Sequence, residues 1–382
     1  MVNSRSERFI KLDNNKINFV QHYVKSIKTT FYIKRWHTFE KMKIHLPIIL
    51  LLLTLFGCGH NENWEEFKGK DLPDFEGYEI LKFGDQSNIY LGGSRSITTG
   101  KKDNQYQFED LCILYESSDY GRTWQKLPFP KIKGAISLID IDGNNIVVVN
   151  QFVTNDSSQF LLSNDAGRNW KKLFSYPDDN YIQSVRIDPD KAIRFVTRER
   201  NGIQKVISMS ESKIDTIILP KGIRHVQLTD DGYIGIDYSP NASSLIEYDL
   251  FGAMISQSKI DLKKPYNLSK QNENGDILYY DRYSATDLVL LRGGQFKNIE
   301  FNGFENYSVV EPFIEDSLIL VNGFYDDDAA FLGVIHTFLV SEDLGKTWSE
   351  EEVPSSMITE PGDLKNGRFL TYAGFGRFQE RK

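Results

Sequence analysis

The chain contains very little cysteine and histidine for its 382 residues, with two cysteines and six histidines in all. It has no Cys-x-x-Cys pair and no Cys/His spacing of the kind that binds zinc, so we expect neither a metal nor another cofactor. Cys112 lies within an apolar run, which favours a small buried side chain over a reactive thiol. The histidines after Cys58 stand alone and are interpreted as structural, namely His60, His225 and His336.

Several widespread catalytic signatures are also absent. The sequence has no P-loop, no Gly-x-Ser-x-Gly nucleophile elbow and no His-Glu-x-x-His zinc helix. The run Asp326-Asp327-Asp328 offers hard oxygen ligands for Ca²⁺, but we favour an acidic solvated loop between blades. These absences argue against the nucleotide-hydrolysing, serine-hydrolase and zinc-protease classes.

Basic residues are scarce beyond the N-terminal segment. The chain has 45 Lys/Arg and 53 Asp/Glu, of which residues 1–57 contain 10 and 3, so 35 basic and 50 acidic residues remain from Cys58 onward. That part of the chain therefore carries a net charge of −15. Nucleic-acid binding requires a basic surface that displaces counterions, so we expect no nucleic-acid partner.

The apolar run near the N-terminus is too short to cross a bilayer, which takes roughly 20 residues. It follows Met42-Lys43 and ends just before Gly57-Cys58, an order typical of an export signal. Leu55-Phe56-Gly57-Cys58 resembles the lipobox of bacterial lipoproteins, and the resemblance implies that Cys58 is acylated and becomes the new N-terminus. An ordinary signal peptide or an uncleaved anchor is the alternative.

These features predict the organisation of the N-terminal region. We interpret residues 42–57 as a lipoprotein signal peptide and residues 58–76 as a lipidated tether, which predicts attachment to a membrane of the bacterial cell envelope. Gly59 stands where lipoproteins retained at the inner membrane usually carry Asp, which favours the outer membrane. Residues 1–41, with nine Lys/Arg and three Asp/Glu, precede a complete signal; we interpret them as an over-extended translation start, or alternatively as a long basic n-region.

Three octads share the pattern Ser-x-Asp-x-Gly-x-Thr-Trp, with Asn169 as the single departure. The residues that carry the pattern are Ser117, Asp119, Gly121, Thr123 and Trp124; Ser163, Asp165, Gly167 and Trp170; and Ser341, Asp343, Gly345, Thr347 and Trp348. The pattern resembles the Asp-box, or BNR repeat, of sialidase-like and sortilin-like β-propellers. The resemblance implies that the octads serve the fold rather than catalysis.

The chemistry of the octad predicts a tight turn between two strands. Aspartate and serine side chains accept hydrogen bonds from backbone N–H groups nearby in the chain. Glycine adopts the positive φ that other residues resist, and the closing tryptophan can fill the space between neighbouring sheets. An apolar stretch precedes each copy, as expected for an antiparallel hairpin.

The spacing of the octads predicts the number of blades. Asp119 and Asp165 are 46 residues apart, and Asp343 follows Asp165 by 178 residues, close to four such steps. Propeller blades repeat at roughly 40–50 residues. Degenerate copies that have lost the octad chemistry occupy the intervening steps at residues 208–212, 248–252 and 291–294.

A second series of turns runs in step with the first. Its members are Asp85-Gln86, Asp142-Gly143, Pro189-Asp190, Asp231-Gly232, Asn274-Gly275, Glu315-Asp316 and Asn366-Gly367. Such dipeptides are typical of hairpin turns. We therefore predict an all-β propeller of four-stranded antiparallel blades over residues 77–382, with seven blades; six is the alternative.

Two parts of the chain need a separate interpretation. The chain continues for only 15 residues after Gly367, so an N-terminal strand within residues 64–78 must complete the last blade and close the ring. Residues 96–109 lie in the longest interval between turns and are interpreted as an inserted loop.

The sialidase resemblance does not extend to a catalytic site. Sialidases clamp a carboxylate with three arginines and use a Tyr/Glu nucleophile pair and an acidic Asp. Between Cys58 and Ser117 this chain has one arginine, Arg95, and the family's Phe/Tyr-Arg-Ile-Pro motif is absent. The other candidates are interpreted as surface charges: Arg186, Arg194, Arg282 and Arg292.

Two functions from different classes follow. The first is a membrane-anchored, non-catalytic module that binds or assembles a protein or glycan partner. The alternative is a divergent sialidase-like glycoside hydrolase or glycan-binding protein. The aromatic segments 279–283 and 374–378 suit stacking on sugars, although core packing explains them equally well.

Overall fold

The computed structural model describes residues 63–74, 76–84, 88–102, 105–151, 157–177, 180–210, 213–238, 243–260, 267–269, 272, 274–280, 288–293, 295–304, 306–326, 334–351, 362–374 and 377–382. Residues Asn61–Lys382 form one compact unit. The signal peptide, Cys58 and the start of the expected tether lie outside the described residues. No helix long and apolar enough for a membrane crossing occurs within the described part of the chain.

The first three blades follow one another in the chain. Blade 1 comprises β2 (Gly77–Phe83), β3 (Ile89–Lys102), β4 (Gln105–Ser117) and β5 (Gln125–Lys126). Blade 2 comprises β6 (Ala135–Asp142), β7 (Asn145–Gln151), β8 (Ser157–Ser163) and β9 (Lys171–Pro177). Blade 3 comprises β10 (Asn180–Ile187), β11 (Ile193–Glu199), β12 (Gln204–Met209) and β13 (Ile214–Ile218).

The next three blades repeat this order. Blade 4 comprises β14 (Ile223–Thr229), β15 (Gly232–Tyr238), β16 (Ser243–Asp249) and β17 (Met254–Ile260). Blade 5 comprises β18 (Asn267–Leu268), β19 (Ile277–Tyr280), β20 (Leu288–Arg292) and β21 (Gln295–Ile299). Blade 6 comprises β22 (Ser308–Glu315), β23 (Leu318–Asp326), β24 (Val334–Ser341) and β25 (Ser349–Glu351).

Blade 7 joins the two ends of the propeller. It comprises β26 (Gly362–Lys365), β27 (Arg368–Gly374), β28 (Arg377–Arg381) and β1 (Trp64–Lys68). β1 pairs antiparallel with β28, with Trp64 opposite Arg381. The closing strand expected within residues 64–78 is therefore Trp64–Lys68, and these residues belong to the propeller rather than to a tether.

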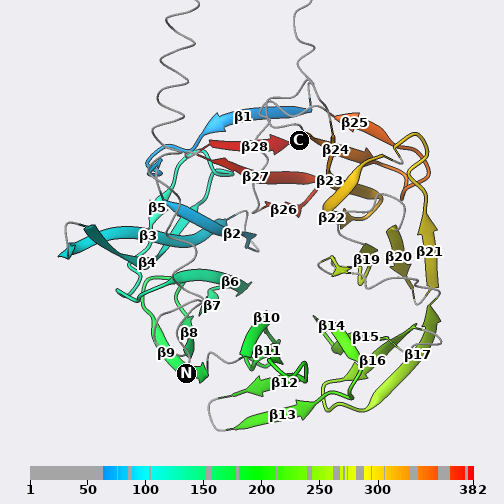
Figure 1. The fold of residues 1–382 in the computed structure, drawn as a ribbon, viewed down its shortest axis with the longest axis horizontal. Helices are drawn as coiled ribbons and strands as arrows, with labels where there is room; N and C mark the ends of the chain where they lie inside the picture. The colour runs from blue at the N-terminus through cyan, green and yellow to red at the C-terminus, as the bar shows by residue number, and fades with distance from the viewer. Residues whose placement is uncertain are drawn as a thin grey trace, which may run out of the picture. The chain divides into compact units, whose positions relative to one another are not determined.

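The seven antiparallel sheets stand around a common axis, with the first strand of each blade nearest the axis and the fourth at the rim (Figure 1). This arrangement confirms the predicted all-β propeller and its count of seven blades. Turns of the second predicted series connect the first and second strands of their blades, as Asp142-Gly143 does between β6 and β7. Asp85-Gln86 lies outside the described residues.

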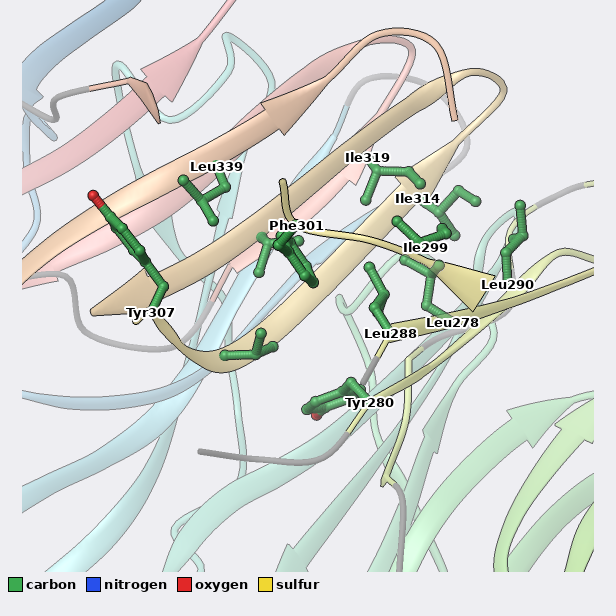
Figure 2. Packing of buried hydrophobic residues seen from close by; sticks show 12 residues of the cluster. Leu278, Tyr280, Leu288, Leu290, Ile299, Phe301, Tyr307, Ile314, Ile319 and Leu339 are labelled. Carbon is green, nitrogen blue, oxygen red and sulfur yellow. The ribbon is translucent and has the colours of Figure 1, made fainter. Parts of the chain in front are cut away.

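The middle strands of the blades contain runs of consecutive buried apolar residues because neighbouring blades cover both of their faces. In β7, the four consecutive residues Ile146, Val147, Val148 and Val149 have no exposed surface. A hydrophobic cluster lies between each pair of adjacent blades. Figure 2 shows the cluster between blades 5 and 6, where Leu278 and Leu288 of blade 5 meet Ile314 and Leu339 of blade 6. Blade-to-blade packing of this kind is the core of the molecule.

The interpretation of residues 96–109 as an inserted loop is wrong. β3 and β4 continue as a paired ribbon through this segment, with Ser96 opposite Asp110 and Lys102 opposite Gln105. Gly100 and Lys101 suggested a loop, but polar and apolar residues alternate over residues 105–109 of β4, as is typical of a strand.

Candidate binding face and axis

The strand order gives the propeller two different faces. Connections between the first and second strands, and between the third and fourth, emerge on one side, which we call the turn face. Connections between the second and third strands, and from blade to blade, emerge on the other side, which we call the loop face. The three octads therefore lie on the turn face, and the start of each first strand lies on the loop face.

Each octad closes its turn with the same set of hydrogen bonds. The Ser117 hydroxyl donates to Asp119 Oδ1 (2.9 Å) and accepts the Gly121 N–H (2.8 Å). Asp119 also accepts the N–H (2.8 Å) and the hydroxyl (2.7 Å) of Thr123. The same contacts recur in the other two octads. Asn169 preserves them, since its amide donates to Asp165 Oδ2 in place of a threonine hydroxyl (2.6 Å).

These hydrogen bonds stabilise the ionised aspartates. Donation from the side chain and then the backbone of Asn169 lowers the pKa of Asp165 to about 2. The backbone and hydroxyl of Thr347 lower the pKa of Asp343 to about 2 in the same way. Both carboxylates are charged at neutral pH and hold the turn in place.

Two residues in each octad, rather than glycine alone, adopt left-handed backbone. Tyr120, Ala166 and Leu344 have φ values of 56°, 55° and 60°, and the glycines that follow them have φ values of 80°, 81° and 77°. A Cβ on Gly345 would lie 2.3 Å from Ile299 Cγ2 of the preceding blade. Glycine is therefore required there for both its backbone and its lack of a side chain.

The octad tryptophans pack against the preceding blade. Trp124 stacks on Phe378 of blade 7 with 5.2 Å between ring centroids, and Trp348 stacks on Phe301 after blade 5 at 4.6 Å. Trp170 meets Phe129, which follows blade 1, edge-on at 4.9 Å. The octads thus join neighbouring blades, and none of the three tryptophans stands free on the turn face.

One degenerate octad keeps part of the turn chemistry that the sequence had suggested was lost. The Asp249 carboxylate accepts the backbone N–H groups of Phe251 (2.9 Å) and Ala253 (2.8 Å). Gly252 has a φ of 87°. This copy lacks the serine and the tryptophan, so the octad pattern does not reveal the surviving Asx turn.

On the loop face, five of the innermost strands share one irregularity. The register shifts near the start of β2, β6, β10, β14 and β22, so that an extra residue bulges from each strand. Four of these bulges carry a polar residue, namely Glu79, Ser137, Gln183 and His225. The four side chains are exposed or partly exposed, and they belong to the strands nearest the axis. We call this set the axial ring.

Bulges re-aim side chains and are common beside functional sites. The axial ring could not be predicted from the sequence, because a bulge interrupts the alternation of a strand over one residue only. Such a break changes neither the composition of the strand nor the spacing of the turns on either side of it.

The electrostatics of the axial ring favour neutral groups. Burial, together with the Arg198 and Arg224 cations, lowers the pKa of His225 to about 4, so its imidazole is neutral at pH 7. The backbone of His225 is left-handed, with a φ of 50°. Burial and the Asp110 carboxylate raise the pKa of Glu79. The ring therefore presents hydrogen-bonding groups with little fixed charge beyond Glu79.

A line of alternating charges lies nearer the turn face. Lys82 of blade 1 pairs with Asp140 of blade 2 (3.3 Å), and Arg186 of blade 3 pairs with Asp230. Asp140 also accepts the N–H of Ile187 (2.8 Å). These contacts connect the innermost strands of successive blades.

A buried carboxylate lies beside the axial ring between blades 7 and 1. Glu76 is 8% exposed and accepts the hydroxyls of Tyr78 (3.1 Å) and Tyr115 (2.8 Å). Burial first, and the Glu76 carboxylate second, raise the pKa of Tyr78. The other oxygen of Glu76 lies 3.7 Å from the guanidinium of Arg95. This arrangement orders the segment that leads into β2.

The arginines considered for a carboxylate clamp have other roles. Arg194 is not a surface charge, since it is fully buried and donates to Asp188 and to the carbonyls of Gly232 and Thr229 in blade 4. Arg292 pairs with Asp276 and reaches the carbonyl of Asp316 in blade 6. Arg282 lies outside the described residues. Within the described ranges these arginines contact neighbouring blades and do not converge on one site.

The remaining candidates resolve as follows. Cys112 is 5% exposed, and burial raises the pKa of its thiol to about 12, as expected of a core residue. Tyr279, Tyr280 and Phe378 from the two aromatic segments are buried strand residues. No cluster of three metal-ligating side chains occurs in the part of the chain that the structure describes. Asp327, Asp328 and His60 lie outside that part.

Comparison with protein-family profiles and with curated protein sequences gave no match to this chain. Among solved structures, the chain is similar to virginiamycin B lyase from Staphylococcus aureus, with a TM-score of 0.55 and 10% identity over 83% of this chain and 98% of that one. It is also matched to TolB from Acinetobacter baumannii, with a TM-score of 0.38 and 13% identity over 77% of this chain and 80% of that one. The likeness to the lyase supports the β-propeller fold and nothing finer.

Proposed function

We propose that this chain is a lipid-anchored, non-catalytic binding module that engages a protein or glycan partner on its loop face. The observation that carries the proposal is the axial ring. Four neighbouring blades each carry a polar side chain at a bulge near the loop-face end of the innermost strand, which suits recognition of a polar surface or loop.

The distribution of charge supports binding over glycoside hydrolysis. A sialidase-like site needs three arginines free to meet one carboxylate, whereas Arg186, Arg194 and Arg292 are each paired with an aspartate. Glu76 contacts two tyrosines, but its carboxylate is closed off from solvent and faces Arg95. A glycosidase requires a second carboxyl group across an open bond site, as the two-carboxylate mechanism demands.

The binding proposal is tested by affinity capture from detergent-solubilised envelope with immobilised Asn61–Lys382. The double variant Gln183→Ala/His225→Ala should lose the captured partner. The variant Lys191→Ala removes an exposed turn-face ion pair with Asp142 and should capture it unchanged. Equal capture by all three proteins would refute loop-face recognition.

The alternative activity is tested in parallel. We expect the domain to leave a fluorogenic sialoside uncleaved. Turnover that disappears in Glu76→Gln, with the melting temperature preserved, would instead favour the divergent glycosidase.

Anchoring rests on the lipobox-like sequence and is tested separately in the full chain. Metabolic labelling with a radioactive fatty acid should mark the protein, and Cys58→Ser should abolish the label and release the protein from membranes. A parent protein that stays in the membrane without taking up the label would instead favour an uncleaved apolar anchor at residues 42–57.

A further inference from the structure

The ribbon formed by β3 and β4 extends well beyond its blade. β3 has 14 residues and β4 has 13, whereas the second strands β7, β11 and β27 have 7 each. The eight residues of β3 beyond Ser94 add roughly 26 Å at about 3.3 Å per residue. Figure 1 shows the pair reaching outward past the neighbouring blades.

The end of this ribbon exposes aromatic rings. Tyr106 is 64% exposed and Phe108 is 66% exposed, and both lie on one side of β4 because they are two residues apart. Their ring centroids are 6.5 Å apart. Opposite them on β3, Lys101 places its ammonium 5.4 Å from the Tyr106 ring. We call Lys101, Lys102, Tyr106 and Phe108 the hairpin tip.

The charge of the hairpin tip is opposite to that of the rest of the domain. Residues 97–108 contain two lysines and one acidic residue, whereas the chain from Cys58 onward carries a net charge of −15. Exposed charges are screened beyond about 10 Å at 0.1 M salt, so a ribbon of this length separates the lysines from the acidic blades. The tip can therefore approach a negative surface that the blades would avoid.

We propose that the hairpin tip contacts the surface of an anionic lipid bilayer. Tyrosine and phenylalanine beside lysine are the side chains that settle at the headgroup level, with rings inserted and ammonium groups at the phosphates. The tip is less suited to binding a protein partner. A stable protein–protein interface buries about 800 Å² on each side, and the tip is the end of a single ribbon. A second membrane contact would also fix how a tethered propeller is oriented.

The test attaches the domain to vesicles without relying on Cys58. Asn61–Lys382 is a compact unit closed by its own strand β1, and an N-terminal histidine tag would hold it on vesicles that contain a nickel-chelating lipid. Gln107→Cys provides one reactive thiol for a polarity-sensitive dye, because Cys112 is buried. Dye emission should shift to the blue on vesicles of phosphatidylcholine with phosphatidylglycerol, and much less on phosphatidylcholine alone.

Matched variants decide the outcome. Tyr106→Ser/Phe108→Ser should weaken insertion at least about tenfold, and Lys101→Glu/Lys102→Glu should remove the preference for anionic lipid. A dye at Phe251→Cys, which is 88% exposed on blade 4, should report water in every sample. An unshifted dye at position 107, or a shift that survives both double variants, overturns the proposal. So does a double variant that leaves the shift intact but loses a captured envelope protein.

Discussion

The octad serines show how one buried hydroxyl can order a turn. Ser117, Ser163 and Ser341 are each 1% exposed, and each hydroxyl both donates to the octad aspartate and accepts the glycine N–H. The aspartate completes the turn only while it is ionised, because it acts solely as an acceptor. Turn stability is therefore coupled to pH.

The coupling has a definite sign. The pKa of Asp343 is lowered to about 2 from 3.8, so its contribution to stability is present above about pH 4 and is lost as the pH falls towards 2. We expect Asp343→Ala to lower the melting temperature at pH 7 and the difference from the parent to vanish near pH 2. Melting curves across this range check the expectation, and a difference independent of pH would contradict it.

The octad glycine combines two constraints that a pair of variants separates. Gly345→Ala meets left-handed backbone and Ile299, whereas Gly202→Ala meets only left-handed backbone, with no atom within 4 Å of the added Cβ. We expect Gly202→Ala to cost about 1 kcal/mol and Gly345→Ala a further 1–3 kcal/mol or so. Urea unfolding measures both changes in the free energy of unfolding. Equal costs would show that the Ile299 side chain moves aside without an energetic penalty.

The single thiol of the propeller, that of Cys112, should be unreactive in the folded protein. Burial raises the pKa of Cys112 to about 12, so almost none of it is thiolate at pH 7. We expect Asn61–Lys382 to react with a thiol reagent only after denaturation, and then once per chain. Rapid reaction of the native domain would instead show that local unfolding exposes Cys112.

At the scale of elements, a buried charged contact fastens β1 to the neighbouring blade. Glu351 of β25 is 5% exposed, accepts the indole N–H of Trp64, and forms two hydrogen bonds with Arg381 at 2.8 and 2.9 Å. One carboxylate thereby joins blade 6 to both the N-terminal and the C-terminal strand of blade 7.

Two glutamates on the same arginine provide a matched comparison. Glu351→Gln leaves the buried Arg381 without its counter-charge and should cost about 3–5 kcal/mol. Glu342→Gln removes the other partner of Arg381, which is 77% exposed, and should cost less than about 1 kcal/mol. Chemical denaturation measures both, and similar costs would mean that Arg381 is solvated in the folded state.

Elements with local chemistry were predictable from the sequence, and elements set by register were not. The octads and the Asp-Gly and Asn-Gly turns need particular residues at particular positions, so the hairpins could be predicted from those residues. The bulge at His225 and the buried position of Arg194 depend on how strands align and blades stack. The hairpin of β3 and β4 was missed because its tip contains residues typical of loops, such as Gly100.

At the scale of the whole molecule, ring closure makes the propeller sensitive to truncation. A chain that begins at Gly77 lacks β1 and leaves β28 with an unpaired edge. We expect it to melt at a lower temperature than Asn61–Lys382 and to form dimers or larger species. Size-exclusion chromatography and calorimetry test this, and a monomer of unchanged stability would show that blade 7 needs only three strands.

The shared seventh blade also sets an order of events. Ribosomes make Trp64–Lys68 before any other strand of the propeller and make its partner, Arg377–Arg381, after all the others. The earliest strand must stay unpaired until the latest one arrives, so six blades can stack while the circle remains open. A chain interrupted anywhere in between cannot finish the circle, and full-length synthesis is thereby a condition of the mature shape.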